Sequence, residues 1–397
     1  MSDDVSAPKR LLMFKVHTFC YNSPFFFIDK TAESFRNAGW EVEVFDGDSR
    51  DLQELDEYTG QRFDAILDFN SSLPRADTTE DEYYLDTIEG PFYNYILDHP
   101  MYHHDELNAE LKNMHIICLD YDHAAYVTKW YPHIKSVHVL PLPGTKSPRD
   151  IPFSKRKYDL TFTGTYTDPD IIMSLIEDFG RELTAEMKSL TEIMIEDPDL
   201  TMEGAFENII KGFGKDPVKD AGSFFAGRMH AYFLVSTYVT AVYRKLVVEK
   251  AAQSGVPFTV IGHGWEKMKS LTKYANVTVR DPVDFDKTFD IMADSRAVLN
   301  VMPWFKNGCH DRIFSAMLNG AVSVTDESAW FSGRLDKGAE YIEYSLKKLD
   351  DIPGIIREAF DDRGEMAEIA RKGMEKAMNY TWKSNCEALI SIFNKTK

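Results

Sequence analysis

The sequence predicts an α/β protein with two doubly wound, Rossmann-like domains, each a parallel sheet between layers of helices. Short apolar runs alternate with amphipathic segments through the first 150 residues, and the same alternation resumes after residue 253. Strands that alternate with helices pair in parallel through right-handed crossovers. A chain of 397 residues is also longer than one ordinary hydrophobic core requires, so it suits two domains.

Six apolar runs are the expected strands of the N-terminal domain. They cover residues 11–16, 41–45, 65–69, 92–97, 114–119 and 136–140, and a helix that reaches residue 36 follows the first of them. Residues 141–157 (PLPGTKSPRDIPFSKRK) then carry four prolines and five basic residues, a composition typical of a linker. We therefore expect the first domain to span residues 1–152 and the second to span 153–380.

The second domain is expected to contain a helical insertion. Strand patterns occur at residues 158–163, 258–261, 277–279, 297–301 and 321–325, and helical patterns at 265–273, 284–293 and 309–319. Residues 170–253 show no strand pattern and three helical patches instead, at 170–195, 203–212 and 222–253. Arg228, His230, Arg244 and Lys245 interrupt the longest patch, which predicts a buried helix rather than a membrane span.

The charge balance restricts the partners that the protein can bind. The formal net charge is −19 and the pI is near 5.0, and such a surface repels nucleic-acid phosphates and anionic lipids. We therefore expect no nucleic-acid partner and no membrane insertion. The four cysteines form no CxxC pair, and neither a long apolar run nor a secretory signal occurs, so the cytoplasm is the expected location.

The segment at residues 299–328 (LNVMPWFKNGCHDRIFSAMLNGAVSVTDES) carries the strongest motif. A strand leads into a loop with Asn307 and Gly308, a helix begins near His310, and a second strand ends at Asp326. His310 and Arg312 stand in the first turn of that helix, where basic side chains oppose the helix dipole unless an anion such as pyrophosphate binds there. The alternative is an ordinary strand–helix–strand unit with a surface arginine.

This segment resembles the donor-binding motif of GT-B-fold glycosyltransferases, in particular the bacterial branch of spore-maturation-protein-like enzymes. The matching residues are Gly308, His310-Asp311-Arg312, Ile313-Phe314, Ala316-Met317-Leu318-Asn319-Gly320 and Thr325-Asp326. The resemblance implies two domains that face a central cleft, with a nucleotide sugar bound to the second. The larger retaining families carry two glutamates eight positions apart, where this chain has Asn307 and Ser315, so the stereochemistry stays open.

Three further segments resemble the same family: TFTGTY at 161–166, VIGHGW at 260–265 and MNYTWKS at 378–384. The last element opens a helix, about residues 381–397, that is expected to pack back on the first domain. The resemblance, which covers residues 90–397, implies a set of donor-binding residues. These are Gly164, Thr165, Arg244, Gly262, Gly264, Trp265, Asn300, Met302, Asn307, Gly308, His310, Asp311, Arg312, Ser315 and Asp326.

Three residues of the first domain are candidates for a base that activates an acceptor hydroxyl. Asp98 and His99 follow a predicted strand, and His17 follows the first strand. Asp98, His99 and Pro100 can equally cap the next helix, and His17 has no visible partner. Although seven of the eleven histidines lie between residues 99 and 138, no HExxH frame or cysteine assists them, so no metal site is expected.

The predicted activity is that of a metal-independent glycosyltransferase of the hexosyltransferase type. A sugar would move from a nucleoside-diphosphate sugar, with a UDP-sugar as the expected donor, to a hydroxyl of a soluble acceptor. That acceptor is a protein, a glycan or a small molecule, and no cofactor is required. Two alternatives remain: a nucleotide-sugar epimerase of the same fold, and a catalytically silent nucleotide-binding scaffold. The sequence does not predict the oligomeric state.

Overall fold

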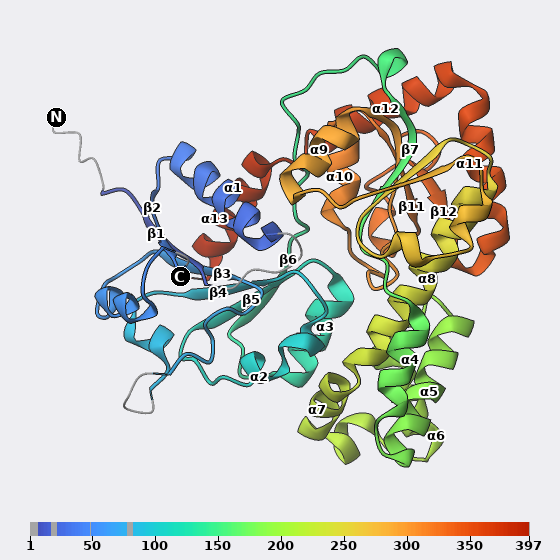
Figure 1. Ribbon diagram of the computed structural model, residues 1–397. Coiled ribbons are helices and arrows are strands. Elements are labelled where there is room, and N and C mark those ends of the chain that lie inside the picture. Colours follow the sequence, from blue (N-terminus) through green and yellow to red (C-terminus); the bar gives the residue numbers. More distant parts are fainter. Residues whose placement is uncertain (1–6, 17–21, 48, 78–81, 397) are drawn as a thin grey trace, which may run out of the picture. The chain divides into compact units, whose positions relative to one another are not determined.

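The computed structural model describes residues 7–16, 22–47, 49–77 and 82–396 (Figure 1). The chain divides into two compact units. Unit 1 is Met1–Leu140 with Trp382–Lys397, and unit 2 is Pro141–Thr381. The chain thus enters unit 2 earlier than the expected boundary at residue 152. His17, one of the three candidate bases, lies outside the described residues.

Unit 1 is built on a six-stranded parallel sheet in the order β2-β1-β3-β4-β5-β6. Its strands are β1 (Arg10–Lys15), β2 (Glu41–Asp46), β3 (Ala65–Phe69), β4 (Phe92–Ile96), β5 (Met114–Cys118) and β6 (Ser136–Val139). All six predicted strands are therefore confirmed. Every residue of β3, β4 and β5 is buried, as expected for central parallel strands with helices on both faces.

Helices cover both faces of this sheet. They are α1 (Ser23–Asn37), α2 (His104–Leu107), α3 (Tyr121–Trp130) and the C-terminal α13 (Trp382–Lys395). Figure 1 shows α1 and α13 side by side. Phe393 of α13 stacks on Phe35 of α1, with ring centroids 5.8 Å apart, and lies 4.4 Å from the ring of Tyr93 in β4. Burial of these aromatic rings holds the C-terminal helix on unit 1.

Unit 2 contains a second six-stranded parallel sheet, in the order β12-β11-β10-β7-β8-β9. Its strands are β7 (Tyr158–Thr163), β8 (Phe258–Ile261), β9 (Val277–Arg280), β10 (Ser295–Leu299), β11 (Val322–Asp326) and β12 (Ile342–Tyr344). The first five were predicted. The sequence pattern missed β12 because three residues are too few to show a strand period.

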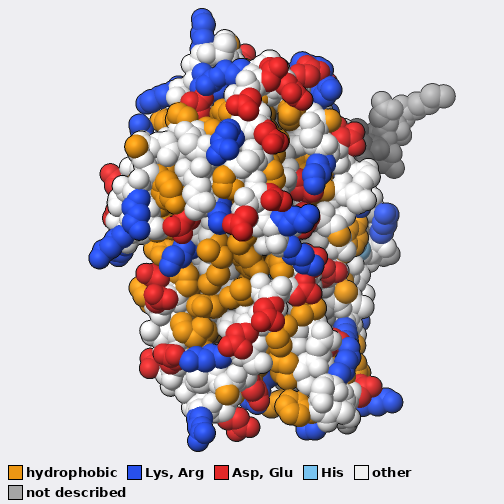
Figure 2. Space-filling view, turned by 90° about the vertical axis from the view of Figure 1, so that its right-hand side faces the viewer, with side chains coloured by type: hydrophobic (Ala, Val, Ile, Leu, Met, Phe, Trp, Pro, Cys, Tyr) orange, Lys and Arg blue, Asp and Glu red, His pale blue; other side chains and the backbone are white. Residues whose placement is uncertain are grey.

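The predicted helical insertion of unit 2 is present, but it is divided differently. It contains α4 (Pro169–Glu177), α5 (Arg181–Glu196), α6 (Met202–Gly212), α7 (Ser223–Ala231) and α8 (Phe233–Gln253). The expected single helices break at Gly180 and Tyr232, which stand at the starts of α5 and α8. The part of the chain that the structure describes contains no helix long and apolar enough to cross a membrane. Figure 2 shows hydrophobic side chains gathered on one face, and Ile171, Leu175 and Phe213 are among the exposed ones of the insertion.

Four more helices complete unit 2: α9 (Phe285–Ala293), α10 (Asp311–Leu318), α11 (Ile352–Asp361) and α12 (Arg363–Ala377). The helix expected at 265–273 is wrong, because the segment forms only two short 3₁₀ turns, Trp265–Lys267 and Leu271–Lys273. Its buried side chains Trp265, Met268 and Leu271 recur every third residue. That spacing is the period of 3₁₀ turns, and over so short a segment it also resembles one face of an α-helix.

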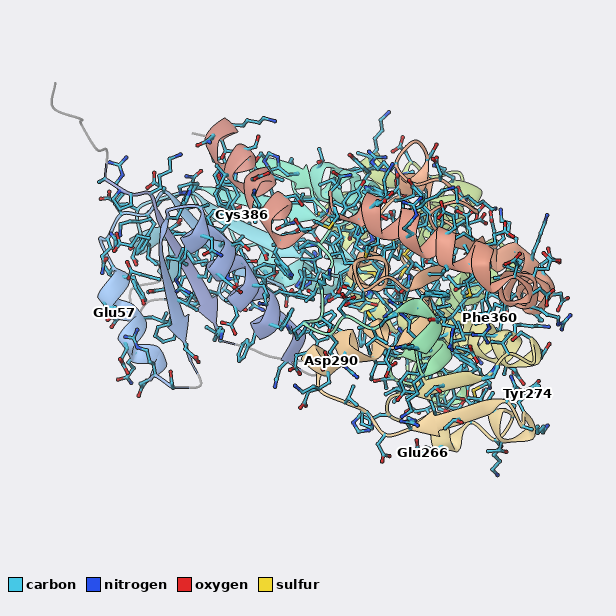
Figure 3. All side chains as sticks on the ribbon, turned by 90° about the horizontal axis from the view of Figure 1, so that it is seen from above. Glu57, Glu266, Tyr274, Asp290, Phe360 and Cys386 are labelled. Carbon is cyan, nitrogen blue, oxygen red and sulfur yellow. The ribbon has the colours of Figure 1, made fainter. Side chains whose placement is uncertain are left out.

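The proline-rich segment 141–157 is packed onto unit 2 instead of forming a free linker. The Thr145 amide donates to the buried Ser315 hydroxyl of α10 at 3.0 Å. The Ser147 hydroxyl donates to Asp290 of α9 at 2.6 Å, and Figure 3 labels Asp290. These bonds fix the backbone of the segment against the helices that flank β10, so the boundary between the units lies before it.

Candidate functional site

The candidate donor site lies at the carboxyl ends of the strands of unit 2. In open α/β sheets, ligands bind beyond these ends and near helix N-termini. Here β10 ends one residue before Asn300, β11 ends at Asp326, and α10 begins after His310. The strongest sequence motif is therefore placed at this edge of the sheet.

A buried hydrogen-bond network supports the loop that follows β10. The Asp326 carboxylate accepts the Met302 amide through both oxygens, at 3.0 and 3.2 Å. The Tyr344 hydroxyl donates to the Asn300 carbonyl at 2.6 Å. Burial raises the pKa of Asp326 to about 7, although the Met302 amide opposes that shift. Asp326 and Met302 thus hold the loop in place.

Arg312 presents a guanidinium group at the first turn of α10. Its Nη1 donates to Asn300 Oδ1 at 3.1 Å, and its guanidinium carbon lies 5.7 Å from the centre of the Phe162 ring. Burial lowers the pKa of Arg312, while nearby Asp311 opposes that shift. Among the described residues, however, no carboxylate oxygen lies within 4.0 Å of the Arg312 guanidinium, the distance that defines an ion pair. The guanidinium thus stands at a helix N-terminus without a close ion-pair partner, and helix N-termini of this kind commonly bind anions.

His310 is the N-cap of α10 and a neutral hydrogen-bond donor. Its Nδ1 accepts the Arg312 amide at 3.3 Å, so the ring proton is assigned to Nε2. Burial, together with the neighbouring guanidinium groups of Arg312 and Arg244, holds the pKa of His310 well below its usual range. The contact of 3.4 Å between Nδ1 and Asp311 is therefore not an ion pair, and Nε2–H can donate to an anion.

Arg244 of α8 and Trp304 add a second cation and an aromatic surface. The Nη1 of Arg244 donates to the Thr165 carbonyl at 3.0 Å, and its guanidinium carbon lies 6.0 Å from the centre of the Trp304 ring. That ring meets His310 edge to face, with centroids 6.1 Å apart. Trp304 is not among the residues predicted from the sequence to bind the donor. Its position, between a strand and a helix N-terminus with basic residues, could have indicated it.

The turns after β7 and β8 pack directly against each other. A Cβ on Gly262 would lie 2.0 Å from the Gly164 carbonyl oxygen, and one on Gly264 would lie 2.4 Å from the Tyr166 carbonyl oxygen. The Gly164 amide donates to the Ile261 carbonyl at 2.9 Å. In this structure the glycines therefore permit close approach of backbone to backbone.

Several residues predicted to bind the donor instead form hydrogen bonds within the protein. Trp265 is fully buried and donates to the Gly164 carbonyl at 2.6 Å. Ser315 is also fully buried, where it accepts the Thr145 amide. Gly308 accepts the Ser328 hydroxyl at 2.8 Å through its carbonyl. Thr165 follows β7, Asn307 lies in the loop after β10, and His310 and Arg312 begin α10, so these residues lie at the same edge of the sheet.

In unit 1, the structure distinguishes the two candidate bases that it describes. His99 is 7% exposed and caps the turn that starts at Pro100, because its Nδ1 accepts the Met101 amide at 3.1 Å. Asp98 is exposed, and its Oδ2 accepts the Asn70 amide group at 3.0 Å. Asp98 Oδ1 has no hydrogen-bond partner among the described residues. Asp98 is thus the better placed of the two to accept a proton.

The other histidines of this region mainly pack. His115 stacks on Tyr93 and bonds to the Ser136 hydroxyl at 2.8 Å, and burial lowers its pKa to about 4. His138 bonds to the same hydroxyl at 2.7 Å. Within the described ranges, no group of three or more His, Cys, Asp and Glu side chains is arranged to hold a metal ion.

The chain is similar to known glycosyltransferases in part of its sequence and in its fold. The family model of glycosyl transferase-like proteins matches residues 244–391. No curated protein matches the sequence. Among solved structures, AviGT4, a glycosyltransferase involved in avilamycin A biosynthesis, is 11% identical with a TM-score of 0.52, over 98% of both chains.

Two further structures were solved with a nucleotide. Alr3699/HepE from Anabaena, in complex with UDP and glucose, is 10% identical with a TM-score of 0.54, over 98% of this chain and 100% of that one. An α-glucosyltransferase in complex with UDP and a 13-mer DNA containing an HMU base is 12% identical with a TM-score of 0.56, over 98% and 100%. At this identity the likeness shows the fold, and the GT-B fold is confirmed.

Proposed function

We propose that this chain, which has the GT-B fold and matches glycosyl transferase-like proteins over residues 244–391, transfers a sugar from a nucleoside-diphosphate sugar to an acceptor hydroxyl. The observation that carries the proposal is the Arg312 guanidinium. It stands at the first turn of α10 and bonds to neutral Asn300 instead of to a carboxylate. A diphosphate would supply the missing negative charge.

The proposed chemistry exchanges one bond at the anomeric carbon of the sugar for another. The bond from that carbon to the diphosphate oxygen breaks, the bond to the acceptor oxygen forms, and the acceptor hydroxyl loses its proton. Negative charge develops on the leaving oxygen, where Arg312, Arg244 and the Nε2–H of His310 stabilise it. In this proposal these groups supply the positive charge, so no metal ion is required.

UDP is the proposed nucleotide. Two of the structures that share the fold were solved with UDP, which supports a UDP-sugar as the donor. The proposed acceptor is a soluble protein, glycan or small molecule, because a net charge of −19 disfavours polyanionic partners. Asp98 is the proposed base if the configuration inverts, because its Oδ1 is open, whereas His99 Nδ1 already accepts a backbone amide.

The experiment that tests this function measures the thermal stability of the full chain with UDP, GDP, dTDP and CDP, each alone and as its sugar conjugate. We expect one nucleotide family, UDP, to raise the melting temperature, since a ligand that binds only the folded state stabilises it. A stabilising donor is then incubated with candidate acceptors, and the nucleotide released is measured. If no nucleotide stabilised the protein, the proposed donor site would be refuted. If the donor sugar were epimerised without an acceptor, the protein would be an epimerase and not a transferase.

A further inference from the structure

The turn that follows β3 in unit 1 has an uncommon backbone. Asn70 and Ser71 are consecutive residues with positive φ angles, 55° and 63°. Non-glycine residues rarely adopt this left-handed conformation, and each costs on the order of 1 kcal/mol unless the surroundings impose it. Such positions concentrate at functional sites. The turn also stands at the carboxyl end of its strand, where ligands bind in this class of sheet.

Buried side chains on both neighbouring strands impose this conformation. Asn94 of β4 is fully buried; its Oδ1 accepts the Ser71 amide at 3.0 Å and its Nδ2 donates to the Ser71 hydroxyl at 2.7 Å. Asp68 of β3 is also fully buried, and its Oδ2 accepts the Leu73 amide at 3.0 Å. Two buried polar side chains thus direct hydrogen bonds to one short turn and hold its shape.

The Asn70 side chain connects this turn to the end of β4. Its Oδ1 accepts the Leu97 amide at 2.6 Å, and its Nδ2 donates to Asp98 Oδ2 at 3.0 Å. The Asn70 amide also donates to the Tyr95 carbonyl at 3.0 Å. One side chain therefore holds both the backbone before Asp98 and one oxygen of its carboxylate, and it leaves the other oxygen open.

We propose that Asn70 is a positioning residue that orients the Asp98 carboxylate toward the hydroxyl group of the acceptor. This inference rests on the proposed function, in which Asp98 Oδ1 takes the acceptor proton. The left-handed backbone aims the Asn70 side chain at the end of β4, and the bond to Oδ2 stops the carboxylate from rotating. A fixed carboxylate saves the free energy of orienting it during the reaction.

A matched pair of glycine variants separates this role from strain. Glycine adopts positive φ without cost, so both Asn70→Gly and Ser71→Gly relieve the backbone, but only Asn70→Gly removes the two side-chain bonds to Leu97 and Asp98. We expect Asn70→Gly to lower kcat for transfer by about tenfold to a hundredfold, the range of a mispositioned catalytic group. Ser71→Gly should stay within about twofold of the wild type.

Asn70→Asp tests which of the two bonds matters. The variant can still accept the Leu97 amide, but it faces Asp98 with an oxygen in place of the NH₂ donor. We expect it to lose as much kcat as Asn70→Gly. Binding of UDP to unit 2, measured by calorimetry, should be unchanged in all three variants. Wild-type kcat in Asn70→Asp would overturn the inference.

A double-mutant cycle distinguishes failure of this inference from failure of the proposed function. If Asn70 acts through Asp98, Asn70→Gly should have no further effect in an Asp98→Ala background. Additive losses in the double variant would show that Asn70 acts independently of Asp98. Wild-type turnover by Asp98→Ala would instead refute the proposed base. Loss of turnover in Asp98→Ala together with wild-type turnover in Asn70→Gly would overturn the positioning role alone.

Discussion

Arg312 donates to Asn300 Oδ1 at 3.1 Å, and this bond joins the first turn of α10 to the loop after β10. Asn300 is fully buried, and its Nδ2 donates to the Thr325 hydroxyl at 3.0 Å. The buried Asn300 side chain therefore holds the guanidinium in a fixed position through a neutral hydrogen-bond acceptor. A cation that is oriented in advance binds an anion with little reorganisation.

The first prediction concerns the effect of Arg312→Ala on nucleotide binding. A hydrogen bond to a charged group contributes about 1.5–3 kcal/mol, so affinity for UDP should fall by roughly tenfold to a hundredfold. The unliganded variant should unfold near the wild-type temperature, because the bond that Arg312 donates goes to the neutral Asn300 side chain and not to a carboxylate. Calorimetry of UDP binding and thermal melts measure the two effects.

Arg280→Ala is the matched control, since Arg280 is an arginine of the same sheet and bonds to the Tyr158 hydroxyl at 3.0 Å. It should keep wild-type affinity for UDP. Equal losses in the two variants would argue against a specific role of Arg312. Arg312→Lys should bind UDP less tightly than the wild type, because an ammonium group cannot bond to Asn300 and a phosphate with the same planar geometry.

The second prediction concerns the pH dependence of stability. Burial raises the pKa of Asp68 in unit 1 to about 7, although the Leu73 amide opposes that shift. Because the folded pKa lies above the unfolded value, the stabilising contribution of this group is present at acidic pH and is lost as the pH rises toward 7. Asp68→Asn keeps an acceptor for the Leu73 amide and removes the ionisation.

The free energy of unfolding of the wild type should therefore fall between pH 5 and pH 8, with a contribution of roughly 2 kcal/mol from Asp68. Urea unfolding at several pH values should show a smaller fall for Asp68→Asn. Asp178→Asn changes an exposed carboxylate and should follow the wild type. A pH dependence that Asp68→Asn leaves unaltered would show that the buried carboxyl does not ionise in this range.

The third prediction concerns Arg156, which closes the C-terminal end of α10. Its guanidinium donates to the carbonyls of Ser295 and Asn319, both at 2.8 Å, and to that of Gly320 at 2.5 Å. Arg156→Ala should lower the free energy of unfolding by about 3 kcal/mol or more, because it leaves several buried carbonyls unpaired. Arg156→Lys should restore little, since one ammonium group cannot reach all of them.

The comparison variant for Arg156 is Arg149→Ala, in the same segment but exposed. Chemical denaturation should show a change within about 0.5 kcal/mol for that variant. A small effect of Arg156→Ala as well would mean that water replaces the guanidinium at these carbonyls.

Most strands could be predicted from the sequence because each is a short apolar run between polar turns, and burial on both faces of a parallel sheet requires such runs. The same local pattern fails where tertiary contacts decide. The spacing of Trp265, Met268 and Leu271 fits a helix as well as 3₁₀ turns. Nothing local to Arg156 shows that it closes the end of a helix more than 150 residues away.

The residues of the candidate site could also be predicted only in part. His310 and Arg312 could be found because they occupy one helix turn and follow a recognisable motif. Trp304 was overlooked because the motif does not specify an aromatic residue there. The left-handed Asn70 was also overlooked, although asparagine is among the few residues that tolerate this conformation. Its partners Leu97 and Asp98 are adjacent only because β3 and β4 pair in the sheet.

The fourth prediction concerns the close approach of Gly262 to Gly164. Gly262 has a φ angle of 148°, and an added Cβ would lie 2.0 Å from a carbonyl oxygen of the backbone. Because neither backbone can move without breaking the pairing of β7 and β8, Gly262→Ala should lower the free energy of unfolding by at least about 2 kcal/mol. Gly180→Ala, where the added Cβ would meet nothing within 4 Å, should change it by less than about 1 kcal/mol, the cost of a poorer N-cap of α5.

The damage from Gly262→Ala should also be local, because Trp265 donates to the Gly164 carbonyl at 2.6 Å. A shift of that carbonyl loosens the buried indole, so the near-ultraviolet circular dichroism of the folded variant should weaken while its helix content stays unchanged. Gly180→Ala should leave both signals unaltered. If Gly262→Ala retained the wild-type stability and the wild-type aromatic signal, the two turns would have to be farther apart than this structure places them. Their proposed part in supporting the donor site would then be lost.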